Sequence, residues 1–366
     1  MGKKSRDTRR RLEAMQQGRQ AVAVRPAAAI PQPEIVESLL EAVQTGNEYT
    51  SILDKKLPPG KNLLDDVVHG IEEIERLRGR PCIMYVGNVV KKDQGESSID
   101  SSDDLPFWEM VAKVPAEQRS VDVFLATWGG SGHQVNNFVN CLRARFDEVH
   151  FLIPSFCMSA GTLFALSGDQ IWMTDRACLG PIDPQVPTAD GRYVPAQALL
   201  LLVAEIQRQG DEAMKNNLPV PWAYVRLIDS LDKKELGEAI TASQYSQTMA
   251  SQFLEKYKFR KWAVRETSGI PVTDEYRKQR ANEIAADLVS HDRWKSHGHA
   301  LSREVLWNTI QLKIDHPGAA LNQAIVRLWA VLTWIFDKTP FVKLLCSAKY
   351  RYARHIIHQI IGPIHP

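Results

Sequence analysis

The sequence has few cysteines. Its 366 residues contain five, which are odd in number and widely spaced, and none forms a CxxC pair. Scattered cysteines of this kind do not make a disulfide framework, and the absence of CxxC argues against a zinc ribbon. This usage is typical of a reducing compartment, so we expect a cytoplasmic protein.

A long hydrophobic run is also missing. The most apolar stretch, Leu328–Phe336, has nine residues and lies between Arg327 and Asp337, whereas a membrane-spanning helix needs about 20. The basic start of the chain is not followed by the apolar segment of a secretory signal, because Arg25 and Pro26 interrupt it. We therefore expect no stable membrane insertion, and we expect the C-terminal apolar stretch to pack as a helix within the protein.

Neither a phosphate-binding loop nor a strong net charge is present. The pattern Gly-x4-Gly-Lys-Ser/Thr does not occur, which excludes ATP hydrolysis by that route. The net charge of +2 argues against a molecule built as a whole to bind polyanions. We expect neither a metal nor another cofactor. Basic residues do gather in the first 25 positions, and they predict a disordered arm over residues 1–33, either simply solvated or bound by an acidic partner.

Short apolar runs alternate with helical periodicity through the middle of the chain. Each run is followed by a segment whose apolar residues recur every three or four positions, as in βαβ units. This order predicts an α/β fold whose core has a largely parallel sheet. From Pro195 onward the helical period dominates and predicts a helical C-terminal region. The predicted strands cover residues 82–90, 121–127, 149–154 and 170–173.

The chain therefore divides into four predicted parts. After the arm of residues 1–33, residues 34–60 form a helical lead-in, with apolar residues at helical spacing in its first half. Residues 61–260 form the α/β core, and residues 261–366 form a helical C-terminal extension.

Two short stretches combine into a pattern that has chemical meaning. Ala126–Gly132 reads Ala-Thr-Trp-Gly-Gly-Ser-Gly at the end of a predicted strand, and Cys157–Thr162 reads Cys-Met-Ser-Ala-Gly-Thr where a strand meets a helix. Acyl transfer needs a nucleophile and two N–H groups directed at the developing oxyanion. A glycine turn exposes backbone amides, and a helix N-terminus presents unpaired N–H groups. Ser159 at that junction is therefore a candidate nucleophile, although a serine at a helix start is more often a cap.

The same stretches carry a family resemblance. Gly129–Ser131 (Gly-Gly-Ser) followed by Met158–Gly161 (Met-Ser-Ala-Gly) resembles, in residue type and in spacing, the two motifs of the Clp protease and signal-peptide-peptidase A superfamily. Leu179–Gln185 (Leu-Gly-Pro-Ile-Asp-Pro-Gln) is similar to the branch named serine dehydrogenase proteinase. The resemblance covers about residues 62–260 and implies a Clp/crotonase-like fold.

The resemblance implies an ATP-independent serine peptidase that acts on peptides or unfolded protein segments and assembles into rings. Carried over by position, Ser159 is the nucleophile that forms an acyl-enzyme. The N–H groups of Gly130 and Ala160 form the oxyanion hole, supported by Gly129. One residue departs from the family pattern, because Trp128 stands where the superfamily usually has proline. We expect its indole to narrow or redirect the substrate groove.

Two branches of the superfamily suggest different catalytic bases. The Clp branch has a histidine about two dozen residues after the serine, but this chain has none between His150 and His291. Asp183 stands near that offset instead. The signal-peptide-peptidase A branch has a lysine about fifty residues on, and Lys215 is the first lysine after Ser159.

To act as a base, a lysine must lose its proton at neutral pH. The pKa of a free lysine is about 10.4, and apolar surroundings lower it. The residues of Leu218–Trp222 can supply such surroundings for Lys215. We therefore predict a Ser159–Lys215 dyad, with Lys233 and Lys234 as alternative bases.

Supporting roles remain open for several polar residues. Asp183 is expected either to orient Lys215 or to stabilise a turn between prolines. Thr162, close to Ser159 in the sequence, is a candidate hydrogen-bond partner of the base. The histidines of residues 291–299 (His-Asp-Arg-Trp-Lys-Ser-His-Gly-His) fit no common zinc motif, so we expect subunit contacts there rather than a metal site.

Two functions of other classes compete with the predicted serine endopeptidase. A crotonase-type acyl-CoA enzyme would use the same amide pair to hold a thioester enolate, but it would not need Ser159. A catalytically inactive assembly or binding protein would keep the fold, and Trp128 favours it. The predicted function is a homo-oligomeric serine peptidase with a Ser-Lys dyad.

Overall fold

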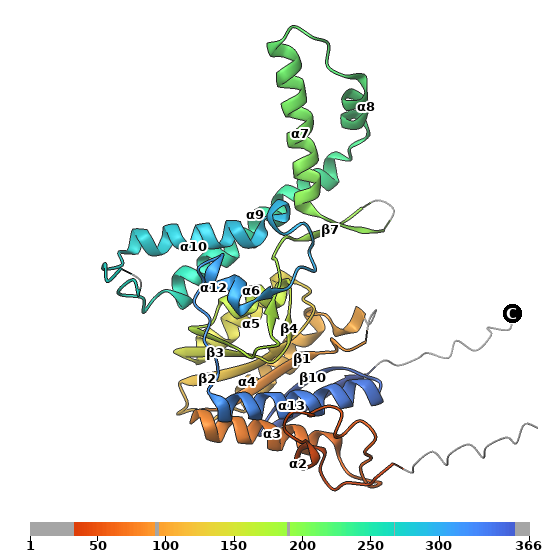
Figure 1. Ribbon diagram of the computed structural model, residues 1–366, viewed down its shortest axis with the longest axis vertical. Coiled ribbons are helices and arrows are strands. Elements are labelled where there is room, and N and C mark those ends of the chain that lie inside the picture. The colour runs from red at the N-terminus through yellow and green to blue at the C-terminus, as the bar shows by residue number, and fades with distance from the viewer. Residues whose placement is uncertain (1–32, 92–94, 189–190, 267, 356–366) are drawn as a thin grey trace, which may run out of the picture.

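The computed structural model describes residues 33–91, 95–188, 191–266 and 268–355. Apart from its last residue, the predicted N-terminal arm lies outside these ranges. The centre of the fold is one sheet of six strands (Figure 1). Its strands are β1 (Cys82–Gly87), β2 (Ser120–Ala126), β3 (Glu148–Ile153), β5 (Gln170–Met173), β10 (Phe341–Ser347) and β11 (Tyr350–His355).

The order across this sheet is β11-β10-β1-β2-β3-β5. The four strands from β1 to β5 are parallel to their neighbours, whereas β10 is antiparallel to β1 and β11 is antiparallel to β10. All four strands predicted from the sequence are present, with ends shifted by at most three residues. The prediction of an α/β fold with a largely parallel sheet is confirmed.

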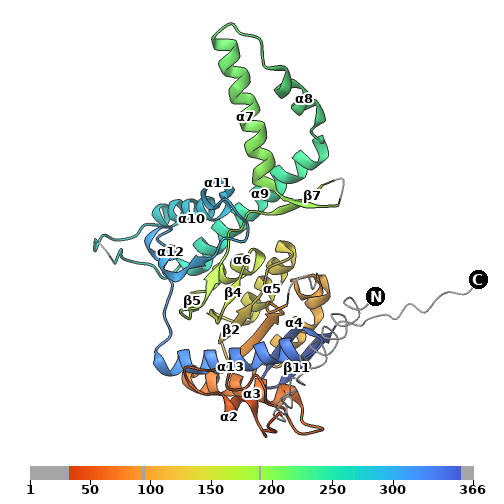
Figure 2. The ribbon, with the colours of Figure 1, turned by 45° about the vertical axis from the view of Figure 1, so that its right-hand side comes forward.

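Helices cover both faces of the sheet. In β1, Ile83 and Tyr85 belong to one hydrophobic cluster, whereas Cys82 and Met84 belong to another on the opposite face. Every residue of β1 is buried, as expected for a parallel strand covered on both sides. One face carries α4 (Asp104–Ala112), α5 (Gly132–Arg145) and α6 (Ala160–Leu166), and the other carries α3 (Leu63–Arg78) and α13 (Ala319–Lys338) (Figure 2).

The ends of α3 follow ordinary capping rules. The Asn62 side chain accepts a hydrogen bond from the Leu64 N–H at 3.0 Å, and Gly79 ends the helix in the left-handed region at φ 65°. The chain then turns directly into β1. The predicted helical lead-in over residues 34–60 is wrong for most of its length. Helix α2 spans only Leu39–Ala42, because Val43 leaves the helical region and Gly46 follows at φ 85°.

The C-terminal part differs from the prediction of a helical extension to residue 366. It is helical as far as α13, but residues 341–355 form β10 and β11, which extend the central sheet. Five of the seven residues of β10 are apolar and all but the first are buried, as pairing beside β1 requires. The extension is therefore part of the core and not an appendage.

Two smaller sheets lie above the carboxyl end of the main sheet. One has the order β4-β6-β9, with β4 parallel to β6 and β9 antiparallel to it. The other is a hairpin of β7 and β8. The bounds are β4 Phe156–Cys157, β6 Cys178–Leu179, β7 Gln185–Pro187, β8 Tyr193–Pro195 and β9 Leu301–Ser302.

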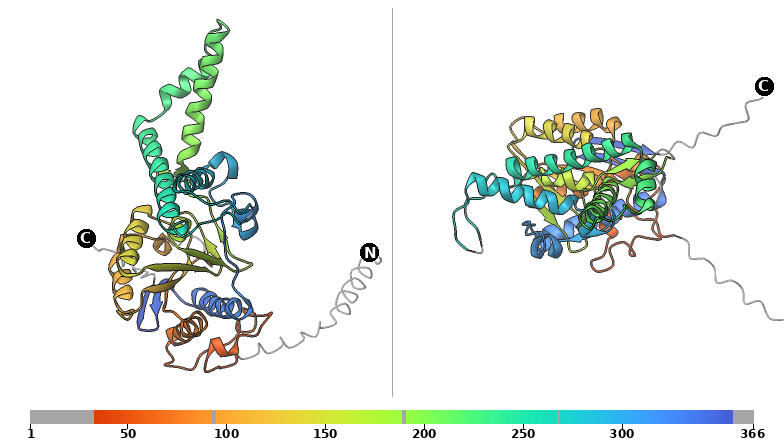
Figure 3. Two further views of the ribbon diagram at one scale, coloured as in Figure 1. Left: turned by 90° about the vertical axis from the view of Figure 1, so that its left-hand side faces the viewer. Right: turned by 90° about the horizontal axis from the view of Figure 1, so that it is seen from above.

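An arm of helices projects from the hairpin. In Figures 1 and 3, α7 (Ala196–Lys215) rises away from the body, and α8 (Trp222–Ser230) leads back to α9. Helix α9 (Lys233–Phe253) returns to the body and continues into a π-helical turn, Leu254–Lys258. The remaining helical elements are α10 (Asp274–Val289), α11 (His291–Trp294), α12 (Arg303–Asn308) and the short turns Gly95–Ser97 and Ser101–Asp103.

Within the described residues, one helix is long and apolar enough to cross a membrane by length and composition. It is α13, and 56% of its most apolar 18 residues is buried inside the fold. Helix α13 lies beside α3 under the sheet (Figure 1). Its burial there is the pattern of a core helix.

Candidate active site

Ser159 occupies a strained turn between β4 and α6. Its backbone has φ 52° and ψ −119°, a conformation that non-glycine residues adopt only when the surrounding structure imposes it. Ser159 stands at the N-cap position of α6, yet its hydroxyl makes no capping hydrogen bond. The ordinary explanation of a serine at a helix start therefore does not apply. Ser159 is half-buried and lines a cleft, as expected for a nucleophile at a strand–helix turn.

The glycine pair lies directly against this turn. The Thr127 N–H donates to the Phe156 carbonyl and the Met158 N–H donates to the Thr127 carbonyl, both at 2.9 Å. A Cβ atom on Gly129 would stand 2.7 Å from Ser159 Cβ, closer than real contacts allow. Gly129 has φ 113°, which favours glycine independently of the space. The two stretches singled out in the sequence are thus in contact.

The residues whose amides are predicted to form an oxyanion hole flank the close contact of Gly129 with Ser159: Gly130 follows Gly129 and Ala160 follows Ser159. Gly130 is held by Ile99, whose N–H donates to the Gly129 carbonyl and whose carbonyl accepts from the Ser131 N–H, both at 2.8 Å. Within the described part of the chain, neither the Gly130 N–H nor the Ala160 N–H donates to another group. Both residues line the same cleft as Ser159. The oxyanion role of these amides stays a prediction that this geometry suits.

The cleft has a volume of about 1030 Å³ and lies between the body and the base of the arm. Its walls come from the glycine turn, the start of α5, the β7–β8 hairpin and the first half of α9. Trp128, 43% exposed, lines one wall and stacks on Phe156 with ring centroids 4.8 Å apart. The indole that replaces the expected proline therefore forms an aromatic wall of the cleft, and Phe156 packs against it. Other residues that line the cleft include Ser98, His133, Pro187, Tyr193, Lys234, Tyr245 and His297.

The structure does not bring Lys215 to Ser159 within one protomer. Lys215 is the last residue of α7, exposed, at the tip of the projecting arm (Figure 1). A helix of 20 residues is about 30 Å long, and Ala196 at its other end is the one near the cleft. Lys234 does line the cleft, but its side chain is 85% exposed and 3.8 Å from Glu238. Neither lysine has the apolar surroundings that a neutral amine requires.

Asp183 has partners that were not predicted from the sequence. Its side chain is fully buried, and it accepts hydrogen bonds from His297 Nδ1 at 2.7 Å and from His291 Nδ1 at 3.1 Å. It therefore neither orients Lys215 nor serves simply as a turn residue. His297 lines the cleft and His291 contacts Asp183 from outside it, while the expected subunit contacts of residues 291–299 stay a prediction. Among the described residues, no group of three or more metal-ligating side chains converges.

Thr162 is not a partner of a base either. Its buried hydroxyl lies 2.9 Å from the Gly180 carbonyl and 3.0 Å from the Cys157 carbonyl, and it accepts from the Gly180 N–H at 2.9 Å. Thr162 thus ties the segment before Asp183 to the turn that carries Ser159. Nearby, burial raises the pKa of the Cys157 thiol well above its ordinary value. Cys157 therefore stays protonated and does not compete as a nucleophile.

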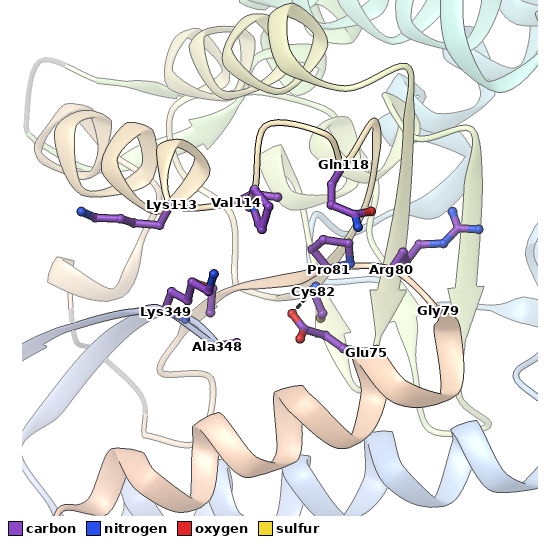
Figure 4. A pocket seen from close by; sticks show the side chains of 12 residues that line it. Glu75, Gly79, Arg80, Pro81, Cys82, Lys113, Val114, Gln118, Ala348 and Lys349 are labelled. Atoms are coloured by element: carbon purple, nitrogen blue, oxygen red, sulfur yellow. Dashed lines mark hydrogen bonds between the residues drawn. The ribbon is translucent and has the colours of Figure 1, made fainter.

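A second pocket lies at the other end of the parallel strands, beside the amino ends of β1 and β2 (Figure 4). It has a volume of about 270 Å³ and is bordered by Pro81 and Gln118, which precede β1 and β2. The Glu75 carboxylate in its wall accepts from the Cys82 N–H at 2.9 Å. Ligands of parallel α/β sheets bind at the carboxyl ends of the strands, which is where Ser159 lies.

The family comparison agrees with this geometry. Residues 99–217 match the family model described as ClpP-like SDH-type serine proteinase. The predicted family resemblance is confirmed over this segment. The matched residues include the glycine pair, Ser159 and Asp183, but they end before the histidines that bind Asp183.

Individual relatives are more distant. MJ0137, an uncharacterized protein of Methanocaldococcus jannaschii, is 34% identical over 97 residues, 26% of this chain and 32% of that protein. MJ1495 of the same organism, also uncharacterized, is 26% identical over 153 residues, 39% of this chain and 49% of that protein. The chain thus spans about a third to a half of the length of these relatives. Among solved structures, a mutant of the 1510-N membrane-bound stomatin-specific protease aligns with a TM-score of 0.25 and 19% identity, over 35% of this chain and 63% of that one.

Proposed function

We propose that the protein is a serine peptidase that cleaves peptides or unfolded protein segments without ATP. The observation that carries the proposal is the uncapped hydroxyl of Ser159 on a strained turn, which lines one cleft with two residues whose amides have no partner in the described chain. Ser159 Oγ attacks the scissile carbonyl carbon and loses its proton to a base, and the C=O electron pair moves to the oxygen. The Gly130 and Ala160 N–H groups stabilise that oxyanion, each by about 2.7–4 kcal/mol. The C–N bond then breaks, the amine takes the proton, and water hydrolyses the acyl-enzyme.

The shape of the cleft supports a chain-like substrate. Its volume of about 1030 Å³ lies at the upper end of the range of ligand-binding clefts, which leaves room for an extended peptide segment. The aromatic wall formed by the Trp128 indole, which stacks on Phe156, offers apolar surface in the same cleft as Ser159. A crotonase-type enzyme would not need an uncapped serine at this turn, so no observation here favours that alternative.

A fluorophosphonate probe tests the nucleophile. The intact chain should gain one adduct, located by peptide mass spectrometry on Ser159, and Ser159→Ala should gain none. Ser302 provides a matched control, because it caps α12 by accepting from the Val305 N–H at 3.3 Å and lies outside the cleft. Ser302→Ala should label at the wild-type rate. A folded wild-type protein that stays unlabelled would refute the peptidase and favour a binding protein that keeps the fold.

The Ser-Lys dyad is the base assignment made from the sequence. In this arrangement Lys215 would have to reach Ser159 from a neighbouring protomer or through a movement of the arm. Lys215→Ala should abolish labelling if the dyad operates. The labelling of Lys215→Ala therefore decides between a lysine as the base and a base that lies within the cleft of the same protomer.

We also propose a cytoplasmic homo-oligomer whose contacts involve the arm. The arm exposes large apolar side chains, among them Trp222 at 79%, Met214 at 74% and Leu218 at 63%. Exposed apolar patches of this kind mark interaction surfaces, and a second copy of the chain is the partner implied by the family resemblance. Light scattering should show an oligomer, and Trp222→Ser with Leu218→Ser should shift it toward the monomer. An unchanged mass would argue against the arm as the contact.

A further inference from the structure

The small sheet β4-β6-β9 gathers three polar residues at one edge. Ser159 follows β4 and Asp183 follows β6, and these two strands are parallel, so their carboxyl ends meet at the same edge. His297 precedes β9, which is antiparallel to β6, so the amino end of β9 lies at that edge too. A serine, a histidine and an aspartate are thereby brought together from three distant segments.

Asp183 is placed rigidly. The Ile182 N–H donates to the Leu288 carbonyl of α10 at 2.9 Å, and the Ser246 hydroxyl of α9 donates to the Ile182 carbonyl at 2.7 Å. The carboxylate itself is fully buried and binds two imidazoles, one on each oxygen. A buried carboxylate held in this way fixes the orientation and the tautomer of the ring that donates to it.

His297 is the ring that reaches the cleft. Its Nδ1 lies 2.7 Å from Asp183 Oδ1. Because a carboxylate only accepts hydrogen bonds, this contact assigns the proton to Nδ1, and the neutral ring then has its lone pair on Nε2. The side chain is 27% exposed and lines the cleft together with Ser159. His291, on the other oxygen of Asp183, does not line the cleft. His133 does line it, but its ring stacks on Tyr245 and no carboxylate of the described residues pairs with it.

We propose that His297 is the general base of this site, and that Asp183 and His291 are its positioning residues. The inference rests on the proposed peptidase function and replaces the lysine as base. His297 Nε2 takes the Ser159 Oγ proton as Oγ bonds to the carbonyl carbon. The resulting imidazolium, stabilised by the Asp183 carboxylate, returns that proton to the leaving amine nitrogen as the C–N bond breaks. Deacylation repeats the cycle, with water donating its proton to Nε2 and the Ser159 oxygen recovering one.

Several other titratable groups line the cleft together with His297. Across the cleft, α9 presents Lys234 and Glu238, which lie 3.8 Å apart and form an exposed ion pair. Asp183 contacts the ring directly, and His291 on α11 contacts the other oxygen of Asp183. The other titratable residues of the cleft are His133 on α5, Tyr193 of β8, and Lys234, Glu238 and Tyr245 on α9.

The test is the rate of fluorophosphonate labelling of the full chain, measured from about pH 5 to pH 9. In the wild type this rate should rise with pH through one ionisation in the range where histidines titrate, about pH 5 to 8. His297→Gln should lower the rate by about 10²- to 10⁴-fold and remove that ionisation. Asp183→Asn should lower it as well, because the ring loses its orientation. Lys215→Ala should leave both the rate and the pH profile unchanged.

Two further variants separate chemistry from folding. His299 lies in the same loop, with its ring 5.3 Å from that of Trp294 and outside the cleft. His299→Gln should label as the wild type does. His297→Gly should regain labelling when free imidazole is added, which a purely structural role does not predict.

The outcomes distinguish this inference from the function on which it rests. Wild-type labelling that survives in His297→Gln with an unchanged pH profile would overturn the base assignment and leave Ser159 as nucleophile. Labelling that is lost in Lys215→Ala would overturn it in favour of the dyad. A wild-type protein without labelling would overturn the peptidase itself.

Discussion

Replacing Lys343 with methionine should destabilise the protein and also weaken its reactivity toward the probe. Lys343 lies in β10, and its side chain has no exposed surface. Its ammonium donates to both oxygens of the buried Asp103 and to the Ser98 carbonyl, each at 2.7 Å. Asp103 in turn accepts from the Tyr85 hydroxyl at 2.7 Å. Methionine keeps the shape of the chain but removes the charge.

The expected cost follows from the charge left behind. Removing one partner of a buried ion pair costs about 3–5 kcal/mol, because the other charge stays without compensation. Arg354 Nη1 lies 3.7 Å from Asp103 and compensates part of it, so we expect the lower end, about 3 kcal/mol. Adding Asp103→Asn removes the orphaned charge and keeps an acceptor for the Tyr85 hydroxyl. The double variant should regain more than half of the loss.

The same contact supports the glycine turn. Lys343 holds Ser98, and the next residue, Ile99, makes the two hydrogen bonds that place Gly129 and Ser131. Loosening this segment should therefore slow fluorophosphonate labelling at least tenfold under conditions where the variant is still folded.

Urea unfolding followed by circular dichroism measures the stability. Lys338→Met is the matched control, because the Lys338 side chain is 40% exposed and its ion pair with Asp337 lies at the surface. A loss below about 1 kcal/mol for Lys343→Met, or one no larger than the control's, would refute the reasoning.

Three further predictions concern other parts of the fold. Burial, with Arg80 and Arg78 nearby, lowers the pKa of His150 to about 4 from 6.5. The unfolded chain therefore binds the proton more readily than the folded chain. As a result, His150 does not reduce the free energy of unfolding above about pH 6.5, but it reduces this free energy progressively as the pH falls toward 4. Wild type should thus lose about 2 kcal/mol more than His150→Gln between pH 7 and pH 5 in urea unfolding, whereas replacing the exposed His69 should not change that loss. Gly129→Ala should lower the free energy of unfolding by about 1–3 kcal/mol and abolish labelling, since the new Cβ meets Ser159. The control Gly210→Ala, in open space on α7, should leave stability unchanged or raise it. Equal effects of the two substitutions would contradict the close approach of Gly129 to Ser159. Trp128→Ala should raise KM for an extended peptide up to about tenfold with little change in kcat, and an unchanged KM would show that the aromatic wall does not bind substrate.

The four parallel strands and the turn that carries Ser159 could be predicted from the sequence because their signals are local. Each parallel strand is a short apolar run bounded by helical periodicity, and β1, β2 and β3 are buried on both faces. The turn at Ser159 is likewise carried by contiguous residues at a strand–helix junction. The pairing of that turn with Gly129 needed only the order of two neighbouring βα units, which the superfamily resemblance supplied.

The sequence did not predict three features of the structure. A short apolar run such as 341–347 follows a long helix and predicts no particular partner, so its pairing with β1 could not be foreseen. The lead-in over residues 34–60 carries helical spacing, but capping and glycine end the helix after one turn. The prediction of Lys215 as the base rests on its distance from Ser159 along the chain, whereas α7 places this residue away from the cleft.

The sequence by itself determined the parallel α/β core, the nucleophile candidate and the amides beside it, because these depend on residues close together in the chain. The tertiary structure alone decided which groups surround that nucleophile. Asp183 and His297 stand 114 positions apart and meet only because β6 pairs with β9. Local periodicity carries no information about such a pairing, since it depends on how whole elements pack.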